Sequence, residues 1–298
     1  TTEGKVASVM SGANITDPPI GVVTAADADK ITVELTNGMT FEGGVNTVGY
    51  LPSKVIGKFV ELTSNTAGCL SVREINKKAP SKNLDLSNRQ IGDAELSTNV
   101  KMYETVGSGI PVRVSFSSIA ITEVPARKIL HVGYDDAGKV DLIIFNNVTG
   151  DGYLYGLVSY DTDSDIEDQE TEEGDESVGK GVYLTNADGI EQRFKYSVSI
   201  PNGNQKKPGG IAVSKTGAVL DYIELNRLED VSRSDFEDGY VVSGGMKIPL
   251  AETVHIYMAD QDKWITDLSQ ARTYSDDMTV YYDRTVEEGG KVRVIIAN

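Results

Sequence analysis

Cysteine and histidine are scarce in this chain of 298 residues, which has one Cys, Cys69, and two His, His131 and His255. A single Cys excludes an intramolecular disulfide and a multi-cysteine metal site. Two His limit histidine catalysis and zinc binding. Long hydrophobic runs are also missing, because none approaches the roughly 18 residues that span a bilayer, so we expect no membrane insertion. The start, Thr1–Gly4, has neither Met nor a signal peptide and is typical of a trimmed or mature fragment.

Basic residues are few relative to acidic ones. The chain has 28 Lys and Arg against 45 Asp and Glu, a formal net charge of −17. Residues 1–150 hold 14 basic and 16 acidic residues, whereas 151–298 hold 14 and 29. Nucleic-acid binding by counterion release needs a basic face, so this balance argues against a nucleic-acid partner.

Much of the acidity lies in residues 161–176, which contain ten acids and no base. Four of these acids fall at positions 1, 3, 5 and 12 of a pattern similar to a calcium-binding EF-hand loop: Asp161, Asp163, Asp165 and Glu172. Ile166 stands where that loop needs Gly, and no flanking helices are indicated. Two interpretations stay open, a calcium site and a solvated hairpin tip kept extended by like charges.

An internal repeat is the most informative pattern. Four pairs of segments match in the same order, at offsets between 149 and 154: Leu35–Asn37 with Leu184–Asn186, Val72–Asn76 with Tyr222–Asn226, Leu96–Tyr103 with Leu250–Tyr257, and Ala137–Ile144 with Gly289–Ile296. They predict a tandem duplication of a unit of about 150 residues. The start of the second copy is open, since Gly156–Ser159 aligns with Lys5–Ser8, which fits the offset better, or with Gly21–Thr24.

The repeat predicts copy one over 1–150 and copy two over 151–298, joined at Thr149–Gly152. Each copy divides into two β subdomains, at about 1–78, 84–148, 151–228 and 238–298. Small barrels or sandwiches fit this spacing of short strands.

The secondary structure is expected to be β throughout, because apolar residues alternate with period two. Ile31–Leu35 alternates and leads to Asn37-Gly38, a type I′ hairpin signal. Val140–Phe145 and Val292–Ile296 are expected to be return strands of hairpins. The predicted fold class is therefore all-β, mainly antiparallel, with a few short helices. The candidates for these helices are Leu86–Leu96, Leu228–Tyr240 and Asp260–Ala271.

No catalytic or cofactor-binding constellation is apparent. The sequence has no Gly-x-Ser-x-Gly nucleophile elbow that could pair with a His, and neither His has the spacing of a metal-ligand pair. Cys69 corresponds to Ala218 or Val219 in copy two, which favours a packing role over a reactive thiol. The glycines of Gly150–Gly152 and Pro208–Gly210 do not have a dinucleotide or P-loop spacing, so turns are the better interpretation of both. We therefore expect no enzyme activity.

Trp264 and the 14 Tyr raise a carbohydrate-binding alternative, because sugars stack on exposed aromatic rings. Tyr153 and Tyr155 alternate onto one strand face, and Tyr281 and Tyr282 take opposite faces. Packing in a core or between domains is the other interpretation of these rings.

Three segments resemble the carboxy-terminal repeat region of S-layer-homology-type surface proteins of gut Clostridia and related Firmicutes: Val182–Gly189, Tyr281–Arg284 and Glu287–Ile296. The resemblance implies a secreted, extracellular, cell-wall- or S-layer-associated and non-catalytic role. It implies partners among cell-wall components, other surface proteins and glycans.

The sequence thus predicts a structural or interaction region of a bacterial surface protein. The alternative is a glycan-binding or adhesin module that recognises cell-wall or host carbohydrate. An enzyme of unrecognised class is the third hypothesis, which would need paired carboxylates in a deep pocket.

Overall fold

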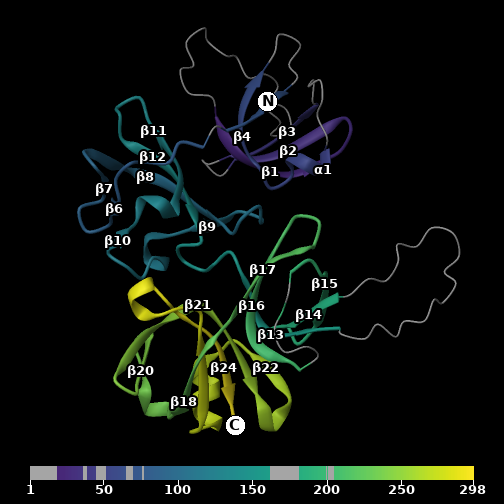
Figure 1. The fold of residues 1–298 in the computed structure, drawn as a ribbon, viewed down its shortest axis with the longest axis vertical. Coiled ribbons are helices and arrows are strands. Elements are labelled where there is room, and N and C mark those ends of the chain that lie inside the picture. The colour runs from purple at the N-terminus through teal and green to yellow at the C-terminus, as the bar shows by residue number, and fades with distance from the viewer. Residues whose placement is uncertain are drawn as a thin grey trace, which may run out of the picture. The chain divides into compact units, whose positions relative to one another are not determined.

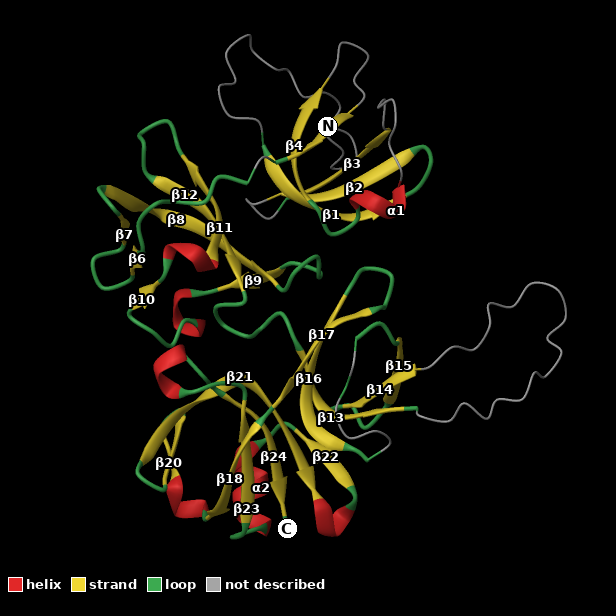
Figure 2. Ribbon diagram, in the orientation of Figure 1, coloured by secondary structure: helices red, strands yellow, loops and turns green. Residues whose placement is uncertain are grey.

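The computed structural model describes residues 19–35, 39–44, 52–64, 70–75, 77–161, 181–198, 200 and 205–298. Strands dominate these residues, and helical segments are short (Figure 2). The all-β class predicted from the sequence is therefore confirmed. Within the described part of the chain, no helix is long and apolar enough to cross a membrane.

The chain forms two compact units, and each contains two stretches of sequence. Unit 1 comprises 1–103 and 123–146, and unit 2 comprises 104–122 and 147–298. The chain consequently passes from one unit to the other three times. These units do not coincide with the predicted copies, because 104–122 of copy one belongs with unit 2.

The first sheet of unit 1 has five strands in the order β3-β2-β1-β4-β5. Its strands and the short helix α1 have these bounds: β1 Ile20–Ala26, β2 Lys30–Leu35, β3 Thr40–Gly44, α1 Pro52–Val55, β4 Phe59–Ser64 and β5 Leu70–Glu74. All four neighbouring pairs are antiparallel. The predicted return of β2 into β3 is confirmed by their pairing, whereas the turn at Asn37-Gly38 lies outside the described residues.

The second sheet of unit 1 has the order β10-β6-β7-β8-β12-β11. The elements that follow β5 are β6 Leu84–Asp85, β7 Gln90–Ile91, β8 Ala94–Thr105, β9 Val112–Val114, η2 Phe116–Ser118, β10 Glu123–Val124, η3 Ala126–Lys128, β11 Ile129–Tyr134 and β12 Val140–Asn146. The predicted return strand at Val140–Phe145 is confirmed, since β12 pairs antiparallel with β11. Phe59 and Tyr103 meet edge to face at 5.3 Å inside unit 1.

The first sheet of unit 2 has the order β15-β14-β13-β16-β17, with all pairs antiparallel (Figure 1). Its strands are β13 Leu154–Tyr160, β14 Gly181–Thr185, β15 Glu191–Lys195, β16 Lys207–Val213 and β17 Val219–Glu224. β13 is the central strand, and Gly156 on it is pressed against the carbonyl oxygen of Thr185, so no side chain fits there.

The second sheet of unit 2 has the order β18-β23-β24-β21-β20-β19, and β22 pairs with β21. Its elements are β18 Asn226–Val231, η4 Arg233–Asp235, β19 Phe236–Glu237, β20 Tyr240–Ser243, β21 Met246–Met258, η5 Ala259–Gln261, β22 Lys263–Ile265, α2 Leu268–Tyr274, β23 Met278–Tyr282, η6 Val286–Glu288 and β24 Val292–Ala297. β24 pairs antiparallel with β23, which confirms the predicted return strand, and parallel with β21.

The core of unit 2 has one part for each sheet and a third part that joins them. The joining part buries Val106, Tyr153, Tyr155, Ala212, Leu225 and Val294. Tyr153 and Tyr155 are each 4% exposed, and their ring centroids lie 6.1 Å apart on one face. Their packing role within unit 2 is therefore confirmed. Tyr281 and Tyr282 contact different parts of the core, as opposite strand faces require.

Two of the three predicted helices are wrong. Leu86–Leu96 forms a turn, β7 and the start of β8, because Arg89 and Gly92 take positive φ angles that end any helical repeat. Leu228–Tyr240 forms β18, η4 and β19, with a strand irregularity between Leu228 and Val231. Asp260–Ala271 is helical only in η5 and in the first residues of α2, where Asp267 caps the helix by accepting from the backbone N–H of Ser269.

The two five-stranded sheets have the same strand order, and β13 takes the place that β1 takes in unit 1. The described residues of the four matching segment pairs lie on or directly beside β2 with β14, β5 with β17, β8 with β21 and β12 with β24. Gly21 on β1 is pressed against the carbonyl oxygen of Glu34, as Gly156 is against that of Thr185. This placement favours the alignment of Gly156 with Gly21, and Lys5–Ser8 lies outside the described residues. The duplication itself stays a prediction.

Candidate functional site

A buried ionic cluster in unit 2 consists of Asp151, Asp283, Lys291 and Arg293. Arg293 Nε donates to Asp283 Oδ2 at 2.9 Å, and its Nη1 donates to Asp151 Oδ1 at 2.8 Å. The side chains of Arg293 and Asp283 are 4% and 0% exposed. Arg293 belongs to β24 and Asp151 precedes β13, so the cluster links the last strand of unit 2 to the segment that leads into the first sheet.

The local sequence places these groups. Asp283 follows β23, and its Oδ1 accepts the backbone N–H of Lys291 at 2.8 Å, which closes the connection between β23 and β24. Tyr155 on β13 donates its hydroxyl to the carbonyl oxygen of Gly150 at 2.8 Å, and its ring lies 4.7 Å from the Arg293 guanidinium. Gly150 has φ +78°, and a side chain there would collide with Asp283 and Arg293. The predicted turn role of Gly150 thus has a second reason.

Charges within the cluster shift the pKa of its members. Burial acts to raise the pKa of Asp151, but Arg293 and Lys291 outweigh burial and lower it. Burial and the neighbouring Arg293 lower the pKa of Lys291. For Arg293, burial is outweighed by Tyr155, Asp283 and Asp151, so its pKa is raised. The guanidinium of Arg293 is therefore the fixed positive charge on which the two carboxylates depend.

The ionic cluster acts on the segment Asn147–Gly152, called here the joint segment, which contains the predicted join between the copies. Glu104, 0% exposed, accepts the backbone N–H of Val148 at 2.6 Å and of Thr149 at 2.5 Å. Its other oxygen lies 3.3 Å from the backbone nitrogen of Gly152, which donates to it. Arg284 Nη1 donates to the carbonyl oxygens of Asn147 and Val148, both at 3.1 Å. Donors and acceptors of the joint segment are thus satisfied by charged side chains.

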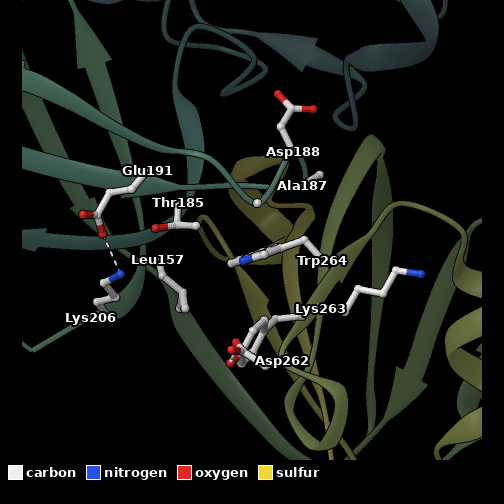
Figure 3. A pocket seen from close by; sticks show the side chains of 11 residues that line it. Leu157, Thr185, Ala187, Asp188, Glu191, Lys206, Asp262, Lys263 and Trp264 are labelled. Atoms are coloured by element: carbon white, nitrogen blue, oxygen red, sulfur yellow. Dashed lines mark hydrogen bonds and ion pairs between the residues drawn. The ribbon is translucent and has the colours of Figure 1, made fainter.

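A pocket of about 560 Å³ lies elsewhere in unit 2, and we call it the Trp264 pocket. Its lining residues come from both sheets and from the turn between β14 and β15: Leu157, Thr185, Ala187, Asp188, Gly189, Glu191, Lys206, Tyr257, Asp262, Lys263 and Trp264. Figure 3 shows the indole of Trp264 directed toward Leu157 and Thr185. The volume is within the range of about 300–1,000 Å³ that is typical of small-molecule sites.

Strand register creates the aromatic wall of the Trp264 pocket. Tyr257 on β21 and Trp264 on β22 are cross-strand partners, and their ring centroids lie 5.3 Å apart. The Tyr257 hydroxyl donates to Asp262 Oδ1 at 2.7 Å, and this hydrogen bond raises the pKa of Tyr257. Asp262 has a left-handed backbone with φ 47°, and its carboxylate lies within hydrogen-bonding distance of the Tyr257 hydroxyl. The two rings are thereby held in one orientation.

The opposite wall is polar. Glu191 and Lys206 form an ion pair at 2.5 Å across the outer part of the pocket (Figure 3). Among the described residues, the hydroxyl oxygen of Thr185 is one of two buried side-chain polar atoms without a hydrogen-bond partner. A buried hydroxyl without a partner costs roughly 1–3 kcal/mol, so a ligand group that hydrogen-bonds to it would recover part of that free energy. The wall therefore contains one acceptor, the Glu191 carboxylate, one donor, the Lys206 ammonium, and one buried hydroxyl without a partner.

The two His residues of the chain each accept a hydrogen bond from a backbone N–H. His131 Nδ1 accepts the backbone N–H of Lys78 at 3.1 Å, and His255 Nδ1 accepts that of Ala187 at 3.2 Å. Burial lowers the pKa of His255, which keeps its acceptor nitrogen unprotonated at neutral pH. His255 thus holds the turn that carries Ala187 and Gly189 over Trp264.

The candidate calcium ligands fall almost entirely outside the described residues. Asp161 is described, whereas Asp163, Asp165 and Glu172 are not. Cys69 also lies outside them. Among the residues whose placement is described, no group of three or more His, Cys, Asp or Glu could hold a metal ion. The calcium site and the packing role of Cys69 stay predictions.

We expect the acid run to be dispensable for folding. The backbone N–H of Asp161 donates to Gly181 at 3.0 Å, and Asp27 donates in the same way to Lys30 at 2.9 Å in the shorter connection of unit 1. Replacing residues 162–180 with Ala28-Asp29 should therefore close the β13–β14 hairpin with a tight turn. Shortening the loop should raise the free energy of unfolding of unit 2 by about 1–2 kcal/mol, since each halving saves about 0.6 kcal/mol. Urea unfolding followed by Trp264 fluorescence measures the change, and a loss of stability would contradict the expectation.

Compared with known proteins, the chain matches no family model, and it matches no curated protein sequence. The ionic cluster and the Trp264 pocket therefore carry the functional argument by themselves. Sequence reasoning selected Trp264 as a carbohydrate candidate but missed Thr185, Glu191 and Lys206. Nothing in the sequence brings these three residues to Trp264, because the two sheets meet only in the folded unit.

Proposed function

We propose that the chain is a non-catalytic structural and interaction region of a secreted, cell-wall-associated bacterial surface protein of the S-layer type. The observation that carries the proposal is that the ionic cluster and Glu104 bind the joint segment through hydrogen bonds and ion pairs. A region that spaces other parts of a surface protein must keep its shape under tension. A joint segment bound by charged groups on both sides is suited to that task.

The strand order supports a load-bearing role. The chain enters unit 2 for the second time through the joint segment, which leads directly into β13, and β24 is the last strand of the unit. Both strands lie inside their sheets and have a hydrogen-bonded neighbour on each side. Tension along either strand must shear two rows of hydrogen bonds together, which requires more force than peeling an edge strand one bond at a time. Arg293 adds a direct connection from β24 to the joint segment.

Single-molecule stretching of the full chain tests this function. We expect the wild-type protein to unfold unit 2 in one step, and Arg293→Met to unfold it at a clearly lower force, because the connection between β24 and Asp151 is lost. Arg233→Met is the matched control, since Arg233 is half-exposed and pairs with Asp276 on the surface. Equal unfolding forces for wild type and Arg293→Met would show that the ionic cluster carries no load.

A second candidate function is recognition of cell-wall or host carbohydrate, as in an adhesin. It is favoured by the Trp264 pocket, where an aromatic wall faces polar groups. Proposed partners are thus cell-wall components or other surface proteins, together with glycans.

Calcium binding at Asp161, Asp163, Asp165 and Glu172 is a further proposal that rests on their spacing alone. The chain with residues 162–180 replaced is its matched control in a calorimetric calcium titration. Absence of heat from the wild-type chain at millimolar calcium would contradict it.

A further inference from the structure

The Trp264 pocket has the chemistry of a site for a neutral saccharide, and we propose that it binds a neutral pyranose unit stacked on Trp264. This inference rests on the second candidate function, carbohydrate recognition, and specifies its ligand class. A pyranose ring has an apolar C–H face and a rim of hydroxyls that donate and accept hydrogen bonds. The Trp264 pocket presents the complementary surfaces from its two walls.

Stacking on the aromatic wall is the first part of the argument. The face of an indole carries partial negative charge, which attracts the weakly positive C–H groups of a sugar ring. Gly189 lies against Trp264, since a Cβ added there would be 3.9 Å from Trp264 Cδ1. The tilted contact with Tyr257 fixes the indole before a ligand arrives, so little side-chain entropy is lost on binding.

Hydrogen bonding on the polar wall is the second part. Thr185 Oγ1 lacks a partner and is buried within this wall, so a small shift of the side chains over it would let a sugar hydroxyl donate to it or accept from it. The Glu191 carboxylate and the Lys206 ammonium stand side by side, so together they offer an acceptor and a donor to neighbouring hydroxyls. Leu157 lies between these groups and the rings and can contact an apolar substituent such as a methyl group (Figure 3).

The charges of the pocket select a neutral ligand. Glu191 and Lys206 compensate each other, and Asp262 is engaged by the hydroxyl of Tyr257. Asp188 and Lys263 also line the pocket, but their charged ends point away from the indole (Figure 3). A uronic acid would bring a negative charge that has no uncompensated cation beside the stacking face, and the Tyr257 hydroxyl already binds the Asp262 carboxylate that an amino sugar would need.

The sole Trp of the chain makes the experiment direct, because Trp264 fluorescence reports on this pocket alone. The full chain is titrated with neutral disaccharides, namely N,N′-diacetylchitobiose, cellobiose, lactose and maltose. Charged counterparts, digalacturonic acid and diglucosamine, are titrated in parallel. We expect at least one neutral disaccharide to change the fluorescence and to release heat in calorimetry, and the charged ones to bind about tenfold more weakly or not at all.

Two variants locate the binding. Trp264→Ala should weaken it about tenfold or more by calorimetry, and Thr185→Val, which keeps the shape but removes the hydroxyl, should weaken it about threefold to tenfold. Tyr274→Ala is the matched control, because Tyr274 is 66% exposed on α2 and does not line the pocket. Circular dichroism confirms that each variant is folded.

The outcomes separate the two claims. Binding of charged but not neutral disaccharides would overturn the inference and leave carbohydrate recognition standing. If neither the neutral nor the charged disaccharides bind, the inference and the proposed carbohydrate recognition are both overturned. Binding that Thr185→Val and Trp264→Ala leave unchanged would place the saccharide elsewhere and overturn the assignment of this pocket.

Discussion

Replacing Arg293 with Met is expected to lower the free energy of unfolding of unit 2 by about 3–5 kcal/mol. The methionine keeps the apolar stem of the side chain but removes its charge. Asp283, whose side chain is 0% exposed, then loses the guanidinium that pairs with it, and Asp151 loses its closest cationic partner. Removing one member of a buried pair leaves an uncompensated charge, which costs more than the pair contributes.

Urea unfolding of the full chain measures this loss, because Trp264 lies in unit 2 and reports its unfolding. Arg233→Met serves as the control, since the half-exposed pair with Asp276 is expected to contribute less than about 1 kcal/mol. Lys291→Met should cost less than Arg293→Met, because burial and Arg293 already lower the pKa of Lys291 and disfavour its charge. A larger loss for Lys291→Met would refute this ranking.

The pH dependence follows from Asp151. Its pKa is lowered in the folded protein, so its contribution is present above its ordinary pKa of 3.8 and is lost as the pH falls through the folded value. The difference between wild type and Arg293→Met should therefore shrink at strongly acidic pH. A constant difference would mean that the ion pair between Arg293 and Asp151 does not contribute to the stability of unit 2.

Replacing Glu104 with Ala is the second large effect, and we expect it to cost about 3 kcal/mol or more. The change leaves the buried backbone N–H groups of Val148 and Thr149, and the partly buried N–H of Gly152, without their acceptor. Glu104→Gln keeps one carbonyl oxygen and should cost about half as much. Glu252→Ala is the control, because Glu252 is exposed on β21. Equal stabilities of Glu104→Ala and Glu252→Ala would show that water replaces the carboxylate.

Local patterns predicted the strands and failed at the helices. The alternation in Ile31–Leu35 and Val140–Phe145 is a property of neighbouring residues, so it was readable from the sequence. In Leu86–Leu96 the apolar spacing imitated a helix, whereas Asp85 accepts the backbone N–H of Asn88 and starts a turn. The spacing of apolar residues does not show that a side chain such as Asp85 competes with the helix for the backbone N–H groups.

The sites were less predictable than the strands because their partners are distant in sequence. Arg293 meets Asp151 across 142 positions, and Glu104 meets Thr149 across 45. The Gly150 turn was recognised, but its closeness to Arg293 was not. Trp264 was singled out because it is unique, whereas Thr185 became notable only when the fold buried its hydroxyl.

The threefold passage of the chain between the units has a consequence for biosynthesis. Unit 1 lacks β11 and β12 until residue 146 has been made, and by then residues 104–122 have already been made without the strands of unit 2 that they belong with. β24, in the interior of its sheet, is the last strand of unit 2 to leave the ribosome. Unit 2 therefore acquires the middle of its second sheet only when its last strand has been made, so it completes its fold after all of residues 147–297 have been translated.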